Sequence, residues 1–291
     1  MSFNTRELLR DCLRSIESHR PPADEVELRI SVLDNASDDG SASMIRADFP
    51  TVRLLRSGEN LGFGRANNQL AASSTADYLL LLNSDTVWTQ DIATPLLEVL
   101  EAWPGAGVTA PRLVEPDGTL QLSSQSLPTP ALELAEVLKG TKLARLLPRW
   151  DTHADVERMR QTHLADRREP RETEFLWATC WMLRSSLVEE HGLFRPEFHM
   201  YDEDLDFCLR MRGAGVKLVY CPHVELVHLG GGSTKAPAAK LLLMRRARAR
   251  FYRLNHGRRA WLAVAVGVTA LQSAKLVKQQ LGRRVRALGR T

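Results

Sequence analysis

Two strand-like segments of this sequence end in polar residues that include a carboxylate. The segment ISVL runs into Asp34 and then NASDDGS, and YLLLL runs into Asn83, Ser84 and Asp85. Open α/β sheets bind ligands at the carboxyl ends of their strands. A carboxylate there can accept hydrogen bonds from a pyrimidine base or a ribose, or hold Mg²⁺ or Mn²⁺ together with diphosphate oxygens. The alternative for both segments is a plain turn, because Asp, Asn, Ser and Gly all favour turns.

A third acidic segment, HMYDEDLDF, carries four carboxylates in the five residues from Asp202 to Asp206. A helix N-terminus tolerates such a cluster because its dipole is positive there, and Asp206 can also pair with Arg210 four residues later. Both explanations are purely structural. Mutual repulsion still predicts a raised pKa for at least one carboxyl group, which suits a general base.

One histidine and one glycine-rich loop complete the candidates for chemistry. His228 follows the apolar segment VELV, and a neutral imidazole at a strand end can ligate a metal ion, although such a histidine is more often structural. The loop ENLGFGRANN lacks the third glycine of a dinucleotide fingerprint and follows no clear strand. We therefore expect its backbone to approach a ligand and its Arg65 to lie near phosphates.

Alternating strand and helix patterns must position these groups. Short apolar segments predict strands, and apolar residues near helical spacing predict helices. The predicted strands are 28–33, 52–55, 78–82, 107–111, 175–183, 216–220 and 224–228, and the predicted helices are 5–18, 64–73, 92–102 and 201–213. The alternation indicates an α/β fold with a mostly parallel central sheet flanked by helices, in which 78–82 is a fully buried strand.

Two further regions differ in composition from this pattern. Residues 123–174 are rich in Pro, Arg and Glu and are predicted to form a less ordered insert, and residues 235–291 are predicted to form a long basic helical extension. No Asp or Glu follows Glu225, whereas 15 of the 39 Lys and Arg do, which leaves 24 basic against 35 acidic residues up to that point. An anionic surface is the expected partner of the extension. Few aromatic residues lie among the basic ones, which favours an anionic membrane surface over nucleic acid.

Hydropathy and cysteine usage narrow the class of protein. The longest apolar stretch, AWLAVAVGVTAL, has 12 residues, whereas a helix needs about 20 to cross a bilayer. The opening residues show no signal-peptide pattern, so we expect a cytoplasmic protein that attaches peripherally to a membrane through the apolar patch at 261–266. The four cysteines form no CxxC pair, which disfavours zinc and a disulfide framework.

Taken in order, these motifs resemble those of the family 2 glycosyltransferases of the GT-A fold. The matching segments are SFN, LDNASDDGS, NLGFGRANN, LLLLNSD, ATCWMLR, MYDEDLDFCLRMRGAGVKLVYCP and VHLGGGS, which lie between residues 1 and 233. The resemblance implies a GT-A-like domain at 1–234 followed by the basic extension. It is strongest to bacterial rhamnosyltransferase-like enzymes of cell-envelope polysaccharide assembly, which places the expected membrane contact at the inner face of the bacterial plasma membrane.

The resemblance also implies a role for each candidate residue. Asp204 would be the catalytic base, with Glu203 and Trp181 on the acceptor side. Asp85 and His228 would hold Mg²⁺ or Mn²⁺. The donor-binding residues would be Asp34, Asn35, Arg65 and Asn83. Asn83 stands where the family's DxD motif has its first Asp, which makes metal binding weaker or more dependent on other ligands.

The implied reaction is an inverting transfer by a single in-line displacement at the anomeric carbon. The donor would be a nucleotide sugar, with dTDP-rhamnose as the first candidate, and the acceptor a glycan or a polyprenyl-linked saccharide. Two other classes stay open. One is a catalytically inactive glycosyltransferase-like binding subunit, which Asn83 would suit. The other is a nucleotidyltransferase, although the usual Gly- and Lys-rich phosphate loop of that class is not seen here.

The N-terminal turn departs from the family pattern. Family members begin with a strand before a Ser-aromatic-Asn turn, and here that turn is already Ser2-Phe3-Asn4. The resemblance therefore implies that the first strand of the sheet is missing from this sequence. A buried backbone group without a partner costs about 1–3 kcal/mol, so we expect the true start to lie upstream. An in-frame start codon further upstream would support this expectation.

Overall fold

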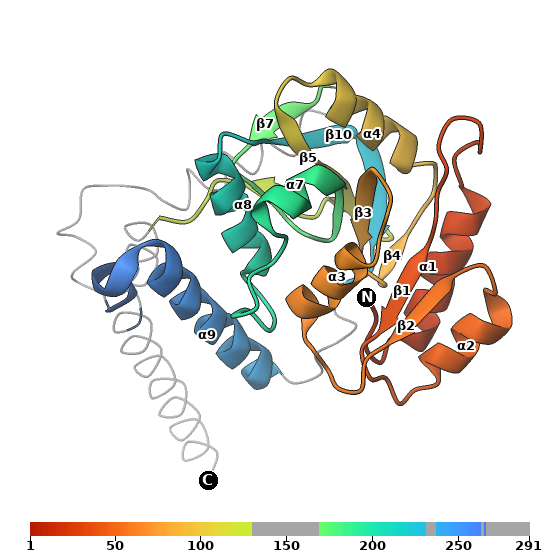
Figure 1. Cartoon of the computed structure of the whole chain (residues 1–291), viewed down its shortest axis with the longest axis horizontal. Helices are drawn as coiled ribbons and strands as arrows, with labels where there is room; N and C mark the ends of the chain where they lie inside the picture. Colours follow the sequence, from red (N-terminus) through yellow and green to blue (C-terminus); the bar gives the residue numbers. More distant parts are fainter. Residues whose placement is uncertain (130–168, 231–236, 263–264, 266–291) are drawn as a thin grey trace, which may run out of the picture. The chain divides into compact units, whose positions relative to one another are not determined.

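The computed structural model describes residues 1–129, 169–230, 237–262 and 265 (Figure 1). The strands are β1 (Ser31–Asp34), β2 (Arg53–Arg56), β3 (Tyr78–Leu82), β4 (Thr86–Val87), β5 (Ala106–Val114), β6 (Ser124–Gln125), β7 (Arg171–Thr173), β8 (Phe175–Leu176), β9 (Cys180–Arg184) and β10 (Lys217–His228). The helices are α1 (Arg6–Ser18), α2 (Ser41–Asp48), α3 (Phe63–Ala72), α4 (Ala93–Ala102), α7 (Ser185–His191), α8 (Glu203–Gly213) and α9 (Pro237–Asn255). The predicted α/β alternation is therefore present.

The central sheet is mixed, so the prediction of a mostly parallel sheet was wrong. Its strand order is β3-β9-β5-β10-β4, with β7 also paired to β10. Strands β5 and β10 are parallel, but β9 runs antiparallel to both of its neighbours, and β4 and β7 run antiparallel to β10. Strands β1 and β2 form a separate parallel pair. An apolar pattern is the same for either strand direction, which is why the sequence did not reveal the reversal of β9.

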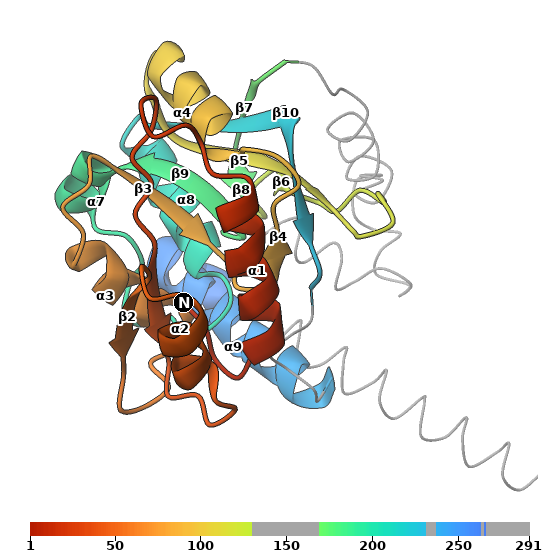
Figure 2. The same ribbon diagram turned by 90° about the vertical axis from the view of Figure 1, so that its right-hand side faces the viewer.

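Helices cover both faces of this sheet, as Figure 2 shows from the side. Side chains alternate along β9 because successive residues of a strand point to opposite faces. Cys180 and Met182 join the core formed with α1 and α4, which includes Ile16 and Leu96. Trp181 packs on the other face. Packing on both faces thus fixes the central strands, and with them the residues at the strand ends.

Several predicted elements have different bounds in the structure. The strand expected at 28–33 begins only at Ser31, and the one expected at 175–183 is divided into β8 and β9. The two strands expected at 216–220 and 224–228 form one strand, β10, with an irregular register between Cys221 and Glu225. Helix α2 was not predicted, because the polar run before it reads as a turn; Gly40, with φ of 85°, ends that turn.

Strand β3 is less buried than its YLLLL sequence predicted. Leu81 is buried, while Tyr78, Leu79, Leu80 and Leu82 keep partial exposure. The reason is topological, because β3 is the end strand of the central sheet in the part of the chain that the structure describes.

The part of the C-terminal extension that the structure describes, chiefly residues 237–262, is helical but not one continuous helix. Helix α9 ends at Asn255, and Gly257 has a left-handed φ of 79°. The backbone divides into one compact unit of Met1–Leu127 with Met159–Ala247 and a second of Pro128–Arg158 with Arg248–Thr291. Among the described helices, none combines the length and apolarity needed to cross a bilayer. Most of the predicted insert and half of the apolar patch at 261–266 lie outside the described residues. The predicted domain boundary stays a prediction.

Candidate active site

Asp34 ends β1 with a fully buried side chain. One carboxylate oxygen accepts a hydrogen bond from the backbone N–H of Ser37 at 3.2 Å. The other oxygen lies 3.4 Å from Nε of Arg56, whose side chain is half exposed. The carboxylate is therefore held at the carboxyl end of its strand, and a nucleoside that reached it would have to share it with Arg56 or displace that guanidinium.

Asn35 organises the loop that faces the end of β1. Its Oδ1 accepts hydrogen bonds from the backbone N–H of Leu61 at 2.9 Å and from Oγ of Ser57 at 3.2 Å. Its Nδ2 donates to Oδ1 of Asn60 at 3.0 Å and to the carbonyl of Gly62 at 3.4 Å. The amide is thus engaged with the protein itself, and its predicted contact with a donor stays a prediction.

Asp85 and His228 come together across the β4–β10 pair. His228 lies opposite Thr86 in the strand register, and its Nε2 is 3.4 Å from Oδ1 of Asp85. Gln121 holds His228 twice: its Nε2 donates to the main-chain carbonyl of His228 at 2.7 Å, and its Oε1 lies 2.7 Å from the ring Nδ1. Since an amide oxygen faces Nδ1, that nitrogen must carry the proton. In the neutral ring, Nε2 then directs a lone pair toward Asp85.

This arrangement fits a divalent cation. A lone pair and a carboxylate that face each other repel unless a cation or a proton lies between them, and an outer-shell partner such as Gln121 is what metal-binding histidines commonly use. Within the described ranges, no group of three or more His, Cys, Asp or Glu side chains could hold a metal ion. Mg²⁺ or Mn²⁺ would therefore need oxygen atoms from water or a diphosphate beside the two protein ligands.

A chain of hydroxyl groups links the end of β1 to the end of β3. Ser2 forms a parallel bridge with Asp34, and its Oγ lies 2.8 Å from Oγ1 of Thr5. That hydroxyl lies 3.0 Å from Oγ of Ser84, next to Asp85. The two carboxylates predicted at strand ends consequently lie along the same edge of the fold.

The loop between β8 and β9 connects this edge to the acidic helix. The backbone N–H of Asn83 donates to the carbonyl of Thr179 at 2.9 Å. The neighbouring N–H of Ala178 lies 3.5 Å from Oδ2 of Asp204. The backbone of Asn83 therefore anchors the loop between β8 and β9. A contact of its side chain with the donor stays a prediction.

Asp204 lies in the first turn of α8, as the acidic cluster predicted. The two residues before the helix, Tyr201 and Asp202, have left-handed φ values of 71° and 61°. Such conformations are uncommon outside glycine and concentrate at functional sites. The carboxylate of Asp204 accepts a hydrogen bond from the N–H of Leu205 at 2.8 Å. The backbone thus turns sharply and places two adjacent carboxyl groups at the helix start.

Both of these carboxyl groups hold their protons more tightly than usual. Burial, and then the charge of Asp202, raises the pKa of Asp204 to about 7. Burial, and then the charge of Asp204, raises the pKa of Glu203 to about 8. The predicted rise in pKa is therefore present, although burial contributes more than repulsion. A carboxyl pKa near neutrality suits a general base.

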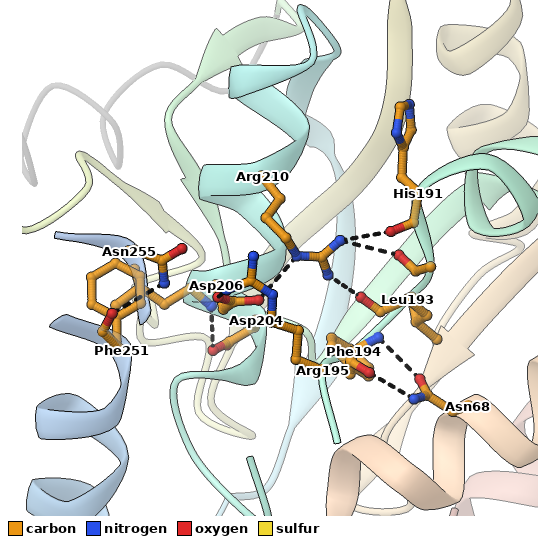
Figure 3. A network of polar contacts seen from close by, with 12 residues as sticks. Asn68, His191, Leu193, Phe194, Arg195, Asp204, Asp206, Arg210, Phe251 and Asn255 are labelled. Carbon is orange, nitrogen blue, oxygen red and sulfur yellow. Dashed lines mark hydrogen bonds and ion pairs between the residues drawn. The ribbon is translucent and has the colours of Figure 1, made fainter. Parts of the chain in front are cut away.

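An ion-pair network fixes the segment that leads to this turn (Figure 3). Buried Asp206 pairs with Nη1 of Arg195 and with Nε of Arg210, each at 3.0 Å. Arg210 also donates to the carbonyls of His191, at 2.8 Å, and of Leu193. The pair between Asp206 and Arg210 was predicted as a structural feature, and the network confirms that interpretation.

Asn68 of α3 holds the same segment from the other side. Its Nδ2 donates to the carbonyl of Phe194 at 2.7 Å, and the N–H of Phe194 donates back to its Oδ1 at 3.0 Å (Figure 3). The reciprocal pair joins α3 to the residues before α8. Sequence reasoning missed this role, because nothing in the pattern around Asn68 marks a contact so distant in the chain.

The glycine-rich loop approaches the protein's own backbone in this structure. Gly62 has a φ of 80°, and a Cβ there would lie 2.1 Å from the carbonyl oxygen of His199. The N–H of Phe63 donates to that carbonyl at 2.9 Å. Arg65 donates to the carbonyl of Pro196 at 3.1 and 3.2 Å. The close approach that the glycine permits is therefore to His199, and phosphate binding by Arg65 stays a prediction.

The exposed aromatic residue near Asp204 is Trp177 rather than Trp181. The Trp181 side chain is fully buried and packs against Phe207, with ring centroids 5.2 Å apart. Trp177 is 39% exposed and precedes Ala178, whose N–H faces Asp204. Burial gives Trp181 a supporting place behind the site, so direct acceptor contact by its ring finds no support here.

Gln121 is the second residue that sequence reasoning missed. The only signal is the preceding turn EPDGT, in which Gly118 has a φ of 81° and the chain reverses along β5. That reversal pairs Leu120 with Val114 and returns the chain toward β10. Nothing in the sequence says that an amide side chain there meets a histidine 107 positions later.

Solved structures with a similar fold are glycosyltransferases. A mannosyltransferase from Pyrobaculum calidifontis, solved with GDP-Man and Mn²⁺, superposes with a TM-score of 0.58 at 16% identity, covering 99% of this chain and 78% of its own. GalNAc-T7, solved with UDP, GalNAc and Mn²⁺, gives a TM-score of 0.52 at 14% identity, covering 83% and 46%. The chain therefore has a GT-A-like fold.

The sequence identifies the family. Residues 1–192 match the model for glycosyl transferase family 2, and the chain belongs to that family. It is 30% identical over 280 residues to the N-acetylglucosaminyl-diphospho-decaprenol L-rhamnosyltransferase of Mycobacterium tuberculosis, covering 90% of this chain and 87% of that relative. The predicted resemblance is thus confirmed, and the nucleotidyltransferase alternative is not supported.

Proposed function

We propose that this glycosyltransferase is an inverting, metal-dependent rhamnosyltransferase. Its donor is dTDP-rhamnose, and its acceptor is a polyprenyl-diphosphate-linked saccharide of the cell envelope. The choice of sugar and acceptor follows the mycobacterial relative, which aligns over 90% of this chain. The structural observation that carries metal-dependent transfer is the approach of the His228 ring Nε2 to the Asp85 carboxylate at 3.4 Å.

The residues at the start of α8 supply the proton chemistry. Asp204 takes the proton from the acceptor hydroxyl while that oxygen attacks the anomeric carbon, and a single displacement inverts the configuration. Its neighbour Glu203, whose pKa is raised to about 8, stays protonated at neutral pH and leaves Asp204 as the charged member of the pair. The N–H groups of Leu205 and Ala178 orient the Asp204 carboxylate.

The strand ends supply the donor side. Asp34 would accept hydrogen bonds from the nucleoside by sharing its carboxylate with Arg56 or displacing that guanidinium, and its backbone is tied through Ser2 and Thr5 to Ser84. Asp85 and His228 would hold Mg²⁺ or Mn²⁺, which would offset the negative charge of the departing diphosphate. Because the hydroxyl chain links the backbone at Asp34 to Ser84, the neighbour of Asp85, nucleoside and diphosphate binding are expected to support each other.

A thermal-shift panel tests this function. The protein is heated with dTDP-rhamnose, UDP-glucose or GDP-mannose, each with and without Mn²⁺. We expect dTDP-rhamnose with Mn²⁺ to raise Tm most, because a ligand that binds only the folded state stabilises it. An Asp85→Ala variant should lose the Mn²⁺-dependent part of that rise. No shift with any nucleotide sugar, in either condition, would instead favour the inactive binding subunit.

Peripheral attachment to an anionic membrane is a separate part of the proposal. Its support is the composition of the extension, which holds 15 basic and no acidic residues after Glu225. Clusters of Lys and Arg bind anionic lipid surfaces, and salt weakens that binding. Flotation with vesicles that contain phosphatidylglycerol is the test. Recovery with the vesicles at low salt and loss at high salt are expected, while equal recovery with neutral vesicles would contradict the idea.

A further inference from the structure

The start of α3 lies directly against residues 194–199, the segment that leads toward the acidic helix α8. A Cβ added at Gly64 would lie 3.2 Å from Cβ of Phe194. A Cβ added at Gly62 would lie 2.1 Å from the carbonyl oxygen of His199, far closer than the two atoms can approach. The missing Cβ atoms of these two glycines thus allow two backbones that are distant in the sequence to touch.

Hydrogen bonds fasten the same contact at three places. The N–H of Phe63 donates to the carbonyl of His199 at 2.9 Å. The guanidinium of Arg65 donates twice to the carbonyl of Pro196, at 3.1 and 3.2 Å. Asn68 forms its reciprocal pair with the beginning of the segment (Figure 3). The segment is therefore bonded to α3 along its whole length.

The loop before α3 is also held by Asn35, the residue after β1. Nδ2 of Asn35 donates to the carbonyl of Gly62 at 3.4 Å, and its Oδ1 accepts from the N–H of Leu61 at 2.9 Å. Oδ1 of Asn60 accepts from the N–H of Gly62 at 2.9 Å. Gly62 is consequently bound to the end of β1 on one side and touches His199 on the other.

The turn that follows His199 is strained. Tyr201 and Asp202 have left-handed φ values of 71° and 61°, and such conformations persist only where the surrounding structure over-determines them. On the α8 side, the carbonyl of Asp202 accepts a hydrogen bond from the N–H of Asp206 at 2.9 Å. On the α3 side, the N–H of Phe63 holds the carbonyl of His199. The turn is therefore fixed at both of its ends, by two different helices.

We propose that Gly62 and the first turns of α3 are a positioning element for the base: they hold the left-handed turn at 201–202 and thereby set the place of Asp204. Arg65 and Asn68 belong to this element as positioning residues that act through the backbone before α8. The catalytic part of the inference rests on the proposed function, in which Asp204 takes the acceptor proton. The structural part, that α3 holds the turn, is independent of that function.

The same element connects the nucleoside side of the site with the base. Asn35 follows Asp34, the proposed nucleoside ligand, and Gly62 takes part both in the bonds of Asn35 and in the contact with His199. A nucleotide that fixes the end of β1 therefore also fixes Gly62, and through it the turn before Asp204. Donor binding and the ordering of the base are thus expected to be coupled.

The structural part is tested by hydrogen exchange without any nucleotide. Gly62→Ala forces a Cβ against the carbonyl of His199, at a left-handed φ that a side chain opposes. The matched control is Gly58→Ala in the same loop, where nothing lies within 4 Å of the added Cβ. The N–H groups of Leu205 and Asp206 should exchange about tenfold faster in Gly62→Ala. In Gly58→Ala they should exchange as in the wild type.

The coupling is tested by repeating the measurement with dTDP and Mn²⁺. We expect slower exchange at the turn in the wild type, because dTDP fixes the loop at Asn35. Gly62→Ala should bind dTDP but show no such slowing. Equal slowing in both forms would show that the nucleotide reaches the turn directly, and would contradict coupling through α3.

Kinetics separate positioning from a merely structural role. In Gly62→Ala, kcat should fall about tenfold or more, while the KM for donor changes by less than about twofold. Burial raises the pKa of Asp204 to about 7. A looser turn admits water and lowers that pKa, so the rise of kcat/KM should move to lower pH. Asn68→Ala removes both bonds to Phe194 without adding a charge, and should give smaller changes in the same direction.

The remaining outcomes count against the inference or against the proposed function separately. Wild-type exchange at Leu205 and Asp206 in both Gly62→Ala and Asn68→Ala would overturn it, whatever the activity. Faster exchange throughout β10 in these variants would show that α3 supports the whole fold and not the turn. Fast exchange at the turn with an unchanged kcat would remove the catalytic part. If the wild type transfers no sugar, the proposed function fails, and the exchange data still decide whether α3 holds the turn.

Discussion

His228 turns its ring Nε2 toward the carboxylate of Asp85, 3.4 Å away. The cause is Gln121, whose amide accepts the proton of the opposite ring nitrogen at 2.7 Å and donates to the main chain of the same histidine. Three side chains from distant parts of the sequence therefore set one tautomer. In the neutral form of the ring this tautomer attracts a cation to the pair, whereas a freely rotating or protonated imidazole would attract it less.

The first prediction concerns Gln121. Gln121→Leu removes both hydrogen bonds and frees the ring, so Mn²⁺ affinity in the presence of dTDP should fall by about 10- to 100-fold. Electron paramagnetic resonance of free Mn²⁺ measures this without turnover. The matched control is Gln125→Leu, in β6, which should leave the affinity unchanged. If both variants bind Mn²⁺ like the wild type, the assignment of the metal site to His228 is wrong.

The second prediction concerns Asp204 as the base. Asp204→Asn keeps the size of the side chain and its contact with the N–H of Leu205 but cannot take a proton. Transfer should drop by about 10²-fold or more, while donor binding stays close to that of the wild type. Single-turnover transfer and thermal shift with donor measure the two quantities. Loss of donor binding with normal transfer per bound donor would contradict a role for Asp204 as the base.

The third prediction follows from the raised pKa of Asp204. A base acts in its deprotonated form, so kcat/KM should rise with pH and level off above about 7. Stability should change in the opposite direction. Because the folded state binds its proton more tightly than the unfolded state, whose pKa is near 3.8, unfolding should become easier as pH rises from about 4 to 7. Denaturant melts across this range check the sign, and Asp204→Asn should flatten the slope.

Strand ends could be predicted from the sequence because an apolar run followed by Asp is a local signal. From apolar runs of this kind we predicted that Asp34, Asp85 and His228 lie at strand ends, and the structure places them there. The cluster around Asp204 could be read in the same way, since a helix N-terminus favours several carboxylates within one turn. These predictions succeeded because each depends on neighbours within a few residues.

Contacts that depend on strand direction or on a distant partner could not be predicted. Trp177 and Trp181 have the same parity, so one continuous strand would have placed both on the same face. The break between β8 and β9 separates them, leaving Trp181 buried and Trp177 exposed. Gln121 likewise acquires its role only when the turn after β5 brings it to β10. The exposure of each tryptophan and the partner of Gln121 both depend on strand pairing, which no local sequence pattern encodes.

The fourth prediction concerns the network around Asp206. Asp206 is fully buried between Arg195 and Arg210, and removing one member of a buried ion pair costs about 3–5 kcal/mol. Asp206→Asn should therefore lower the free energy of unfolding by a few kcal/mol, which urea denaturation measures. Glu189→Gln, at an exposed position of α7, is the control and should change stability little. A loss no larger than in this control would show that the network does not hold the turn before α8.

The last prediction assigns the acceptor platform to Trp177. Its ring is 39% exposed, and the next residue donates toward Asp204, so an acceptor sugar beside the base would lie within reach of the indole face. Stacking by an aromatic ring contributes about 0.5–1.5 kcal/mol. Trp177→Ala should therefore raise the KM for acceptor by about tenfold and leave the Kd for donor unchanged, whereas Trp177→Phe should restore most of the acceptor affinity. Kinetics at varied acceptor and saturating donor measure the KM for acceptor, and thermal shift with donor reports donor binding. An equal loss of donor binding would mean that the ring supports the fold of the β8–β9 loop instead.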